Sequence, residues 1–467
     1  MSSCCTRVRV VESHKVSPPP NSVSSPTLLP LTFSDVFWIP FSNTQKLFIY
    51  NFPSISTSYF ISSFLPALKT SLSLSLHHFF PLAGSFIPPA HPTDRPCIRY
   101  EDGCFVALTV AEATGDFSHL TDKRRLINAT EFHPLVPDLS VDDVTGRTSV
   151  LALQFTVFPD CGICFGITYK HVVADGKSIS AFLSAWSSTC NNRCVLPPNT
   201  VLPIIDRSLI PDPPNGFCLD SYLKQIFEPK DEGKKPAAGP SEAKVRGTFV
   251  ITRSEIEKLR QWVLKRAENE NLHLSTFVLT CSLIWVNLIK SDAAVRKPNV
   301  DATDVCRFGQ VVDCRDRYEF KSIVPSAYFG NCLAYGCFAL AKRTELEGED
   351  GFVVAVRAMG NRIKKLEEEG ALTEAQSWLA DFFDISSTGS VFTVAGSPRL
   401  GVYGLEFGWG RPDRVEVVSI DSSSSISIAE SADGEGGVEI GLVLGMPQMQ
   451  AFVSIHEESK YILCRSY

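Results

Sequence analysis

The stretch of residues 151–191 constrains the fold most, because it joins a strand pattern to a helix pattern through one short polar turn. Residues 151–169 are rich in Val, Phe and Ile, which favours strand. After the turn, apolar residues recur at the spacing of an amphipathic helix: Ile179, Phe182, Leu183 and Trp186. The sequence therefore predicts a strand–turn–helix unit around which the rest of the chain is arranged.

The turn reads His171-Val-Val-Ala-Asp175-Gly176. We expect Gly176 to let the chain bend sharply, and Asp175 or Ser178 to supply the oxygen that caps the helix amides. His171 closes the strand and can project into a cleft. An imidazole titrates near neutral pH and can serve there as a general base, although a histidine at a strand end can also be a satisfied core residue.

Asp175 allows two interpretations. Its carboxylate could orient the imidazole of His171, or it could hold the turn through a cap or a salt bridge. Four residues of non-helical chain would more readily point the two side chains apart, so we favour the structural role for Asp175.

The length and net charge of the chain indicate how many domains it has and which ligands it binds. Its 467 residues exceed one ordinary core and predict two domains, residues 1–210 and 247–467, joined by a Pro-rich and then polar crossover at residues 211–246. The net charge of −7 and the lack of a long basic block argue against a nucleic-acid partner. Small molecules are the expected ligands.

Nothing in the sequence indicates secretion or a membrane span. The N-terminus has no apolar signal core, and the apolar run at residues 274–289 carries polar interruptions typical of a buried helix. The 15 cysteines are expected to be buried thiols in a reducing compartment. Cys161 and Cys164 have redox spacing, but on a strand they point to opposite faces. We expect a cytoplasmic monomer.

Several short motifs resemble one family. HVVADG matches the HxxxDG motif of the plant BAHD acyltransferases, and further family marks follow in the expected order over nearly the whole chain. They are LPLTFSDVFW at 29–38, FPLAG at 80–84, LSTFV at 274–278, YFGNC at 328–332 and EFGWG at 406–410, where relatives have DFGWG. YFGNC is typical of the branch that acylates flavonoid, anthocyanin and phenolic glucosides.

The resemblance implies a fold and a reaction. The fold is the two-domain coenzyme A-dependent acyltransferase type, α/β with mixed sheets and an active-site channel between the domains. The reaction transfers an acyl group from malonyl-CoA or a hydroxycinnamoyl-CoA to a hydroxyl of a flavonoid, anthocyanin or other phenolic glycoside. Acyl-CoA is a co-substrate, and because a thioester is already activated, no cofactor or metal is required.

The resemblance also suggests roles for particular residues. His171 is the general base, and the indole N–H of Trp409 is a candidate donor to the oxyanion. Structural roles fall to Gly408 and to Glu406, which would pair with an arginine such as Arg315. For coenzyme A the matched positions are Ser275 and Thr276, with Lys258 as a possible phosphate partner. Lys177 is a candidate contact for a malonyl carboxylate, or it simply faces solvent.

Alternatives remain open on the sequence alone. The acceptor could be another plant alcohol or an amine. The replacement of Asp by Glu406 would suit an acyltransferase-like binding protein with weak activity. A redox protein would use Cys161 and Cys164, and its thiol-dependent activity would survive the loss of His171.

Overall fold

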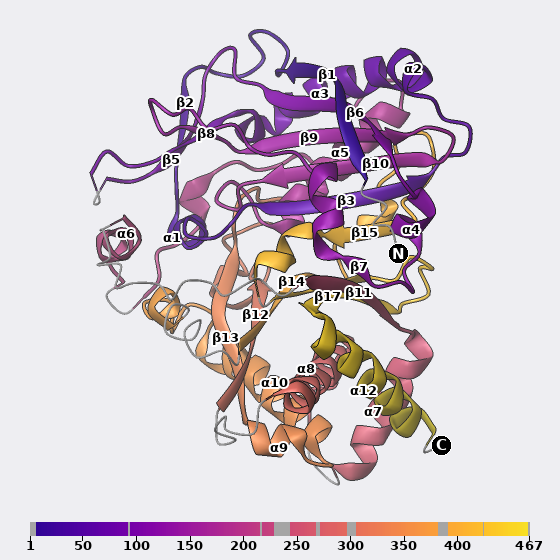
Figure 1. Cartoon of the computed structure of the whole chain (residues 1–467). Helices are drawn as coiled ribbons and strands as arrows, with labels where there is room; N and C mark the ends of the chain where they lie inside the picture. Colours follow the sequence, from indigo (N-terminus) through magenta and orange to yellow (C-terminus); the bar gives the residue numbers. More distant parts are fainter. Residues whose placement is uncertain are drawn as a thin grey trace.

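Two mixed β-sheets lie one above the other in Figure 1, the first formed mainly by the N-terminal half of the chain and the second mainly by the C-terminal half. The computed structural model describes residues 6–91, 94–214, 217–227, 243–267, 271–296, 305–381, 391–423 and 425–465. Parallel and antiparallel pairs occur in both sheets, so the predicted α/β architecture with mixed sheets is confirmed.

The first sheet has six strands. In spatial order they are β1 (Arg7–Val16), β6 (Val106–Thr114), β9 (Leu151–Phe158), β10 (Gly162–Tyr169), β3 (Thr44–Asn51) and β15 (Arg414–Val417). The predicted strand run at residues 151–169 is the hairpin of β9 and β10, in which Phe155 stands opposite Phe165. Every residue of both strands is buried, as expected for a central hairpin covered on both faces.

Two helices cover the face of this sheet that carries Phe165. They are α3 (Leu65–His78) and α5 (Gly176–Asn191). Trp186 of α5 packs edge-on against Phe155 and Phe165, and its indole Nε1 donates to the Leu68 carbonyl of α3 at 3.2 Å. The apolar stripe that predicted this helix therefore faces the sheet, and it fixes the direction in which the turn before α5 leaves β10.

The second sheet has seven strands. They are β13 (Leu333–Lys342), β12 (Val305–Asp313), β14 (Val391–Gly396), β16 (Ser425–Glu430), β17 (Val438–Gly445), β11 (Lys244–Ile251) and β7 (Ile127–Asn128). Helices of this half within the described residues include α7 (Arg253–Arg266), α8 (Thr276–Val295), α9 (Arg343–Glu347), α10 (Gly351–Glu369) and α12 (Met446–Arg465). The expected capping box of Thr252 and Glu255 starts α7.

The helix α8 corresponds to the apolar run of the sequence. Within the described part of the chain it is the one helix long and apolar enough to cross a membrane, but 72% of its most apolar window is buried inside the protein. It packs between α10 and α12. A helix that is apolar on all sides and enclosed in this way is a core helix, as predicted.

Each half of the chain gives one strand to the other half. β15 pairs with β3 and completes the first sheet, whereas the short β7 pairs with β11 at the edge of the second sheet. In Figure 1 the yellow β15 lies directly beside the indigo β3. The predicted division into 1–210 and 247–467 stays a prediction, and a cut at these bounds would not separate two independent sheets.

The crossover at residues 211–246 is also more structured than predicted. It contains α6 (Leu219–Phe227), whose Tyr222 and Leu223 are buried in the core of the first half. The end of the segment already belongs to β11. Residues 228–242 of the crossover lie outside the described residues.

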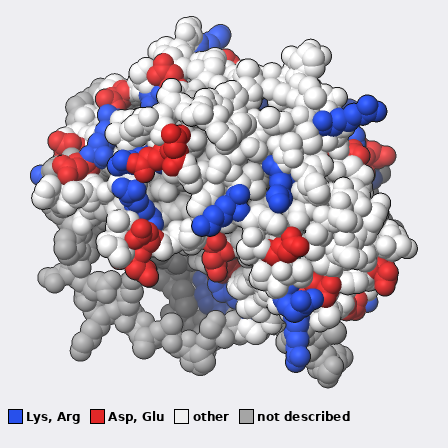
Figure 2. Space-filling model, turned by 90° about the horizontal axis from the view of Figure 1, so that it is seen from above, with Lys and Arg blue, Asp and Glu red and all other residues white. Residues whose placement is uncertain are grey.

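A smaller sheet and several short helices also belong to the first half. A four-stranded sheet contains β2 (Thr27–Pro30), β5 (Cys97–Tyr100), β4 (Ser85–Ile87) and β8 (Thr148–Ser149). Three short helices are α1 (Phe33–Val36), α2 (Thr57–Tyr59) and α4 (Phe117–Thr121). On the face shown in Figure 2, acidic and basic side chains alternate, and neither sign dominates a continuous area.

Candidate active site

His171 lies just beyond the end of β10, in the turn that leads into α5. Its ring stacks on the indole of Trp38, with a centroid distance of 3.6 Å and an interplanar angle of 23°. Burial lowers the pKa of His171 to about 4, although the Asp175 carboxylate raises it. The imidazole is therefore neutral at pH 7, which is the protonation state that a general base needs.

Asn331 determines which nitrogen of His171 carries the hydrogen. The side-chain Nδ2 of Asn331 donates to the Asp35 carboxylate and to the backbone carbonyl of His171, both at 2.9 Å. Both partners only accept hydrogen bonds, so the Asn331 Oδ1 must face the imidazole Nδ1, which lies 3.1 Å away. Nδ1 therefore carries the hydrogen and donates it, and the lone pair is left on Nε2.

Two buried residues hold Asn331 in this orientation. Asp35 is itself fixed because its Oδ2 accepts from the backbone N and the hydroxyl of Thr32 at 2.9 and 2.8 Å. Arg207 lies 3.7 Å from Asp35 and donates to the Val173 carbonyl at 2.9 Å. The imidazole is thus positioned by residues from four separate parts of the chain.

Gly330 makes this arrangement possible. A Cβ at this position would lie 1.6 Å from Nη1 of Arg207 and 2.6 Å from the hydroxyl of Tyr328. Only glycine lets the loop pass so close to the buried guanidinium. The tight backbone approach expected for the YFGNC motif is therefore confirmed.

Asp175 holds the turn and does not contact the imidazole. One carboxylate oxygen accepts from the backbone N of Ser178 at 2.9 Å and so caps α5; the other accepts from Arg315 at 2.7 Å and from the backbone N of Cys332 at 3.2 Å. Burial would raise the pKa of Asp175, but the charge and hydrogen bonds of Arg315 outweigh it, and the pKa lies below its usual value. The geometry agrees with the structural role that we favoured.

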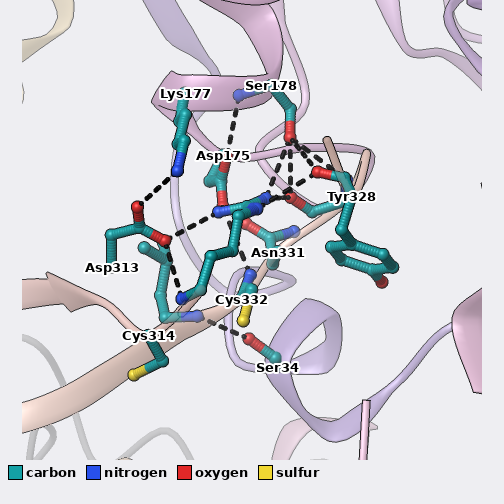
Figure 3. A network of polar contacts seen from close by, with 12 residues as sticks. Ser34, Asp175, Lys177, Ser178, Asp313, Cys314, Tyr328, Asn331 and Cys332 are labelled. Atoms are coloured by element: carbon teal, nitrogen blue, oxygen red, sulfur yellow. Dashed lines mark hydrogen bonds and ion pairs between the residues drawn. The ribbon is translucent and has the colours of Figure 1, made fainter. Parts of the chain in front are cut away.

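Figure 3 shows that the ion pair of Asp175 and Arg315 continues to Asp313 and Lys177, which are both partly exposed. Asp313 accepts from Arg315 at 2.9 Å and from the ammonium of Lys177 at 3.1 Å. Arg315 also donates to the Gly330 carbonyl at 2.9 Å, so one buried guanidinium joins β12, the start of α5 and the YFGNC loop. Lys177 is half-exposed and its charge is already matched by Asp313.

Two expectations for the motif residues need correction. Gly176 is the first residue of α5, and its backbone does not lie in the left-handed region; an added Cβ would only reach van der Waals contact with Leu400 at 3.4 Å. The bend therefore comes from the preceding turn. Arg315 pairs with Asp175 and Asp313, and Glu406 makes no ion pair with any described residue. The pairing expected from the resemblance fails because Arg315 is already saturated by closer carboxylates.

Trp409 lies in a separate aromatic cluster. Its ring contacts Phe64 at a centroid distance of 5.2 Å, and Tyr50 and Phe155 at 6.0 Å. Phe155 stands opposite Phe165, six residues before His171, which is about 20 Å of extended strand. The geometry therefore does not support the predicted oxyanion contact, although the indole Nε1 finds no acceptor among the described residues.

The loop around Trp409 is shaped by its glycines. Gly408 has a φ of +101° and Gly410 a φ of +100°, values that side-chain-bearing residues rarely adopt. The main chain at Glu406 is tied to α5, because Nδ2 of Asn191 donates to its carbonyl at 2.8 Å. The loop therefore braces the far end of the helix that His171 precedes, and it is structural, as expected for Gly408.

The three positions expected to bind coenzyme A lie on α7 and at the start of α8, two helices that contact each other. Ser275 caps α8 by accepting from the backbone N of Val278 at 3.3 Å, and Thr276 is the first residue of that helix. Arg260 of α7 reaches the adjacent Leu274 carbonyl at 3.1 Å, and Lys258, two positions earlier, lies on a different side of the helix. Lys258 instead lines a surface hollow with Arg253 and Gln261.

The other candidate chemistries receive no support from the geometry. Cys161 is exposed in the turn between β9 and β10, whereas Cys164 is buried on β10, where burial raises the pKa of its thiol. Among the described residues, no cluster of three or more His, Cys, Asp or Glu side chains could hold a metal ion.

Four residues of the site were not assigned a role from the sequence: Trp38, Asp35, Asn331 and Arg207. The first three stand in motifs that resemble the family, which was the one signal available. Arg207 lies near the end of the first predicted domain and gave no signal, because its importance depends on the Tyr328 hydroxyl, which it reaches at 3.0 Å.

His171, held in one tautomer by Asn331, therefore lies where segments of both α/β halves meet. The fold is that of the coenzyme A-dependent acyltransferases. Vinorine synthase has a similar structure, with a TM-score of 0.68 and 20% identity over 96% of this chain and 98% of that chain. F. graminearum TRI101 in complex with coenzyme A and T-2 mycotoxin gives a TM-score of 0.63 at 14% identity, covering 93% and 99%.

The chain belongs to the family described as the Transferase family, the BAHD acyltransferases, whose model matches residues 6–459. It is an acyl-CoA-dependent acyltransferase. It is 36% identical to phenolic glucoside malonyltransferase 1 of Arabidopsis thaliana, over 96% of this chain and 97% of that protein. It is also 36% identical to coumaroyl-CoA:anthocyanidin 3-O-glucoside-6''-O-coumaroyltransferase 1 of Arabidopsis thaliana, with the same coverage.

Proposed function

We propose that this enzyme transfers an acyl group from acyl-CoA to a sugar hydroxyl of a flavonoid, anthocyanin or other phenolic glycoside, with His171 as the general base. The names of the two Arabidopsis relatives support the donor and acceptor classes. The observation that carries the role of His171 is the hydrogen bond from its Nδ1 to Asn331, which leaves Nε2 as the free base.

The reaction follows from that geometry. Nε2 of His171 takes the proton from the acceptor hydroxyl while the hydroxyl oxygen attacks the thioester carbonyl carbon. The tetrahedral intermediate then collapses, the carbon–sulfur bond breaks, and the proton on Nε2 passes to the departing thiolate. The Asn331 Oδ1 stabilises the imidazolium between the two steps through the Nδ1 hydrogen. The thioester is already activated, so the chemistry requires no metal or prosthetic group.

Replacement of His171 tests this role. His171→Ala should lower kcat by about 10²- to 10⁴-fold, the usual contribution of a general base. The matched control is His456→Ala, because His456 is also buried with its pKa lowered by burial to about 4, yet it lies on α12. A His171→Ala enzyme that keeps more than about a tenth of wild-type turnover contradicts the proposal.

The pH profile gives an independent measurement. A base must be unprotonated, so activity is present above the pKa of His171 and is lost as the pH falls through it. Because burial places that pKa at about 4, kcat/KM should show no limb from His171 between about pH 5 and pH 8. An acid limb near pH 6.5 that disappears on replacement of His171 would show an ordinary, exposed imidazole.

Three further expectations belong to the proposal. Coenzyme A contacts Ser275 and Thr276, with Lys258 as a possible phosphate partner, and affinity measurements on the three alanine variants test these contacts. The partners are small molecules and not nucleic acid, as the net charge of −7 and the mixed charges of Figure 2 favour. The enzyme acts as a cytoplasmic monomer, for which size-exclusion chromatography with light scattering and a fluorescent fusion in plant cells provide the tests.

A further inference from the structure

Lys46 is a buried cation that the reaction described above does not use. It lies on β3, opposite Ile167 of β10, and only 5% of its surface is exposed. Side chains of β10 alternate between the two faces of the sheet, so Ile167 and Tyr169 lie on the same face. His171 follows Tyr169 by two residues, just beyond the strand. Within the described ranges, no hydrogen bond or ion pair reaches the Lys46 ammonium. A solitary ammonium in such a position is costly unless something else meets it.

The side chain lines a cavity between the two sheets. The cavity has a volume of about 30 Å³, and its walls come from β3 and β15 on one side and from β14, β16, β17 and β11 on the other. Leu400 also lines it and lies 3.4 Å from where a Cβ of Gly176 would stand. The cavity is thus adjacent to the start of α5, where the catalytic turn ends.

The charge of Lys46 also reaches the base. Its ammonium is among the groups that lower the pKa of His171, after the larger effect of burial. Two features connect Lys46 to the catalytic turn: the shared Leu400 wall and this electrostatic influence.

The acidic groups near the cavity do not neutralise Lys46. Glu416 is bound by Arg414 at 2.7 Å and by Arg246 at 3.2 Å, and Glu439 is bound by Lys123 at 2.7 Å. Glu430 raises the pKa of Lys46 from a distance, but it forms no ion pair with it within the described residues. The charged residues that line the cavity are Lys46, Glu416 and Glu439, and both glutamates are already held by the cations named above.

We propose that Lys46 binds the free carboxylate of the acyl donor, and that the preferred donor is therefore a short dicarboxylic acyl-CoA of the malonyl type. This inference rests on the proposed acyl transfer and specifies its donor. Among the described residues that line the cavity, Lys46 is the cation without an ion pair, and its ammonium can pair with one carboxylate. Lys177, the candidate favoured by sequence proximity, already pairs with Asp313 and is half-exposed.

The size of the cavity points to the same class of donor. A space of about 30 Å³ holds a carboxylate in place of one or two waters, whereas an apolar cavity that binds benzene is about 150 Å³. Burial lowers the pKa of Lys46 to about 8, so the side chain is mainly an ammonium at neutral pH. A malonyl carboxylate would gain an ion pair there, while an acetyl group would leave the ammonium unmatched.

Donor competition in the full-length enzyme tests the inference. Malonyl-CoA, acetyl-CoA and p-coumaroyl-CoA are each offered with one phenolic glucoside, and kcat/KM is measured for each donor. The wild type should prefer malonyl-CoA over acetyl-CoA by at least about 100-fold, a discrimination within reach of a site built for a polar group. Lys46→Met, which keeps the length of the side chain, should abolish most of that preference by lowering kcat/KM for malonyl-CoA far more than kcat/KM for acetyl-CoA.

Two controls separate the possible causes. Lys177→Met removes a lysine from the same side of the catalytic turn and should leave the malonyl preference unchanged. Lys46→Arg keeps the charge and should retain part of it. In a binding measurement, malonyl-CoA should raise the melting temperature of the wild type more than coenzyme A does, and Lys46→Met should remove that difference.

The outcomes that overturn the inference differ from those that overturn the proposed function. If the wild type uses p-coumaroyl-CoA or acetyl-CoA as well as malonyl-CoA, or if Lys46→Met keeps the malonyl preference, then Lys46 does not select the donor although the enzyme is an acyltransferase. If no donor is transferred, the proposed function itself fails. Should Lys46→Met not fold, the wild-type donor ranking alone still decides.

Discussion

Asn331, 160 positions beyond His171, is the residue that fixes the reactive form of the base. Its amide orientation is determined by two groups that only accept hydrogen bonds, and the imidazole must follow. A residue that acts on another side chain in this way is a positioning residue. Its effect should therefore be seen in kcat and in the pH profile more than in substrate binding.

We predict that Asn331→Ala lowers kcat by about 10²-fold and leaves KM for acyl-CoA nearly unchanged. The imidazole would then sample both tautomers and rotate, and a wrongly held imidazole costs up to about 10⁴-fold in serine proteases. Steady-state kinetics with one donor and one glucoside measure the effect.

The matched control is Asn287→Ala. Nδ2 of Asn287 lies 3.1 Å from Nδ1 of His456, which makes a second buried Asn–His pair with the same separation. Its loss should reduce the melting temperature to a comparable degree and leave kcat within about threefold. Equal losses of kcat in both variants would mean that Asn331 acts through stability alone.

At the scale of single residues, the sequence identified His171 as the candidate base but not the residues that position its imidazole. His171 was found because a histidine in a strand–turn–helix unit stands out locally. The role of Asn331 depends on contacts across 160 residues with His171 and across 296 with Asp35, which no local pattern records. Trp409 shows the opposite error, because a motif resemblance suggested chemistry that its position beside Phe155 does not support.

At the scale of the elements, the N-terminus of α5 is held by a fully buried ion pair. Asp175 and Arg315 are both fully buried, and Asp313, which shares the same guanidinium, is 36% exposed. The two carboxylates therefore contribute unequally, although both lie within 3 Å of Arg315.

We predict that Asp175→Asn lowers the free energy of unfolding by about 3–5 kcal/mol, because it leaves part of a buried charge unpaired. Asp313→Asn should cost less than about 1 kcal/mol, since solvent screens that side of the guanidinium. Denaturant unfolding monitored by circular dichroism compares the two. Similar losses would show that burial does not distinguish the two ion pairs.

The elements themselves were predictable where their patterns were long. The β9–β10 run and the α5 stripe formed as the sequence indicates. The two exchanged strands were not predictable, because β7 has two residues and β15 four. Such short strands carry no periodicity, and their partners are set by the packing of the whole sheet.

Across the whole molecule, the exchanged strands and a shared core join the two halves. The core of the first half includes Tyr328, Trp378 and Phe407 from the second half of the chain. A cut between the halves in sequence is therefore not a cut between two cores, and neither half is expected to keep its fold alone.

We predict a single cooperative unfolding transition for the full chain. Differential scanning calorimetry should give equal calorimetric and van't Hoff enthalpies, the criterion of a two-state transition. A fragment of residues 1–210 should lack stable tertiary structure, while the same fragment should regain it when refolded together with residues 211–467. Two resolved transitions in the full chain would instead demonstrate independent domains.

The place of β15 also bears on how the protein is made. In the first sheet, β3 would be an open edge without β15, and its Leu47, Phe48 and Ile49 are among the most deeply buried residues. During synthesis at about 5–20 residues per second, the ribosome needs roughly 20–70 s for the stretch of about 360 residues between β3 and β15. For that interval the backbone hydrogen-bonding groups at this edge of β3 have no partner strand. We expect molecular chaperones to bind the nascent chain at this strand.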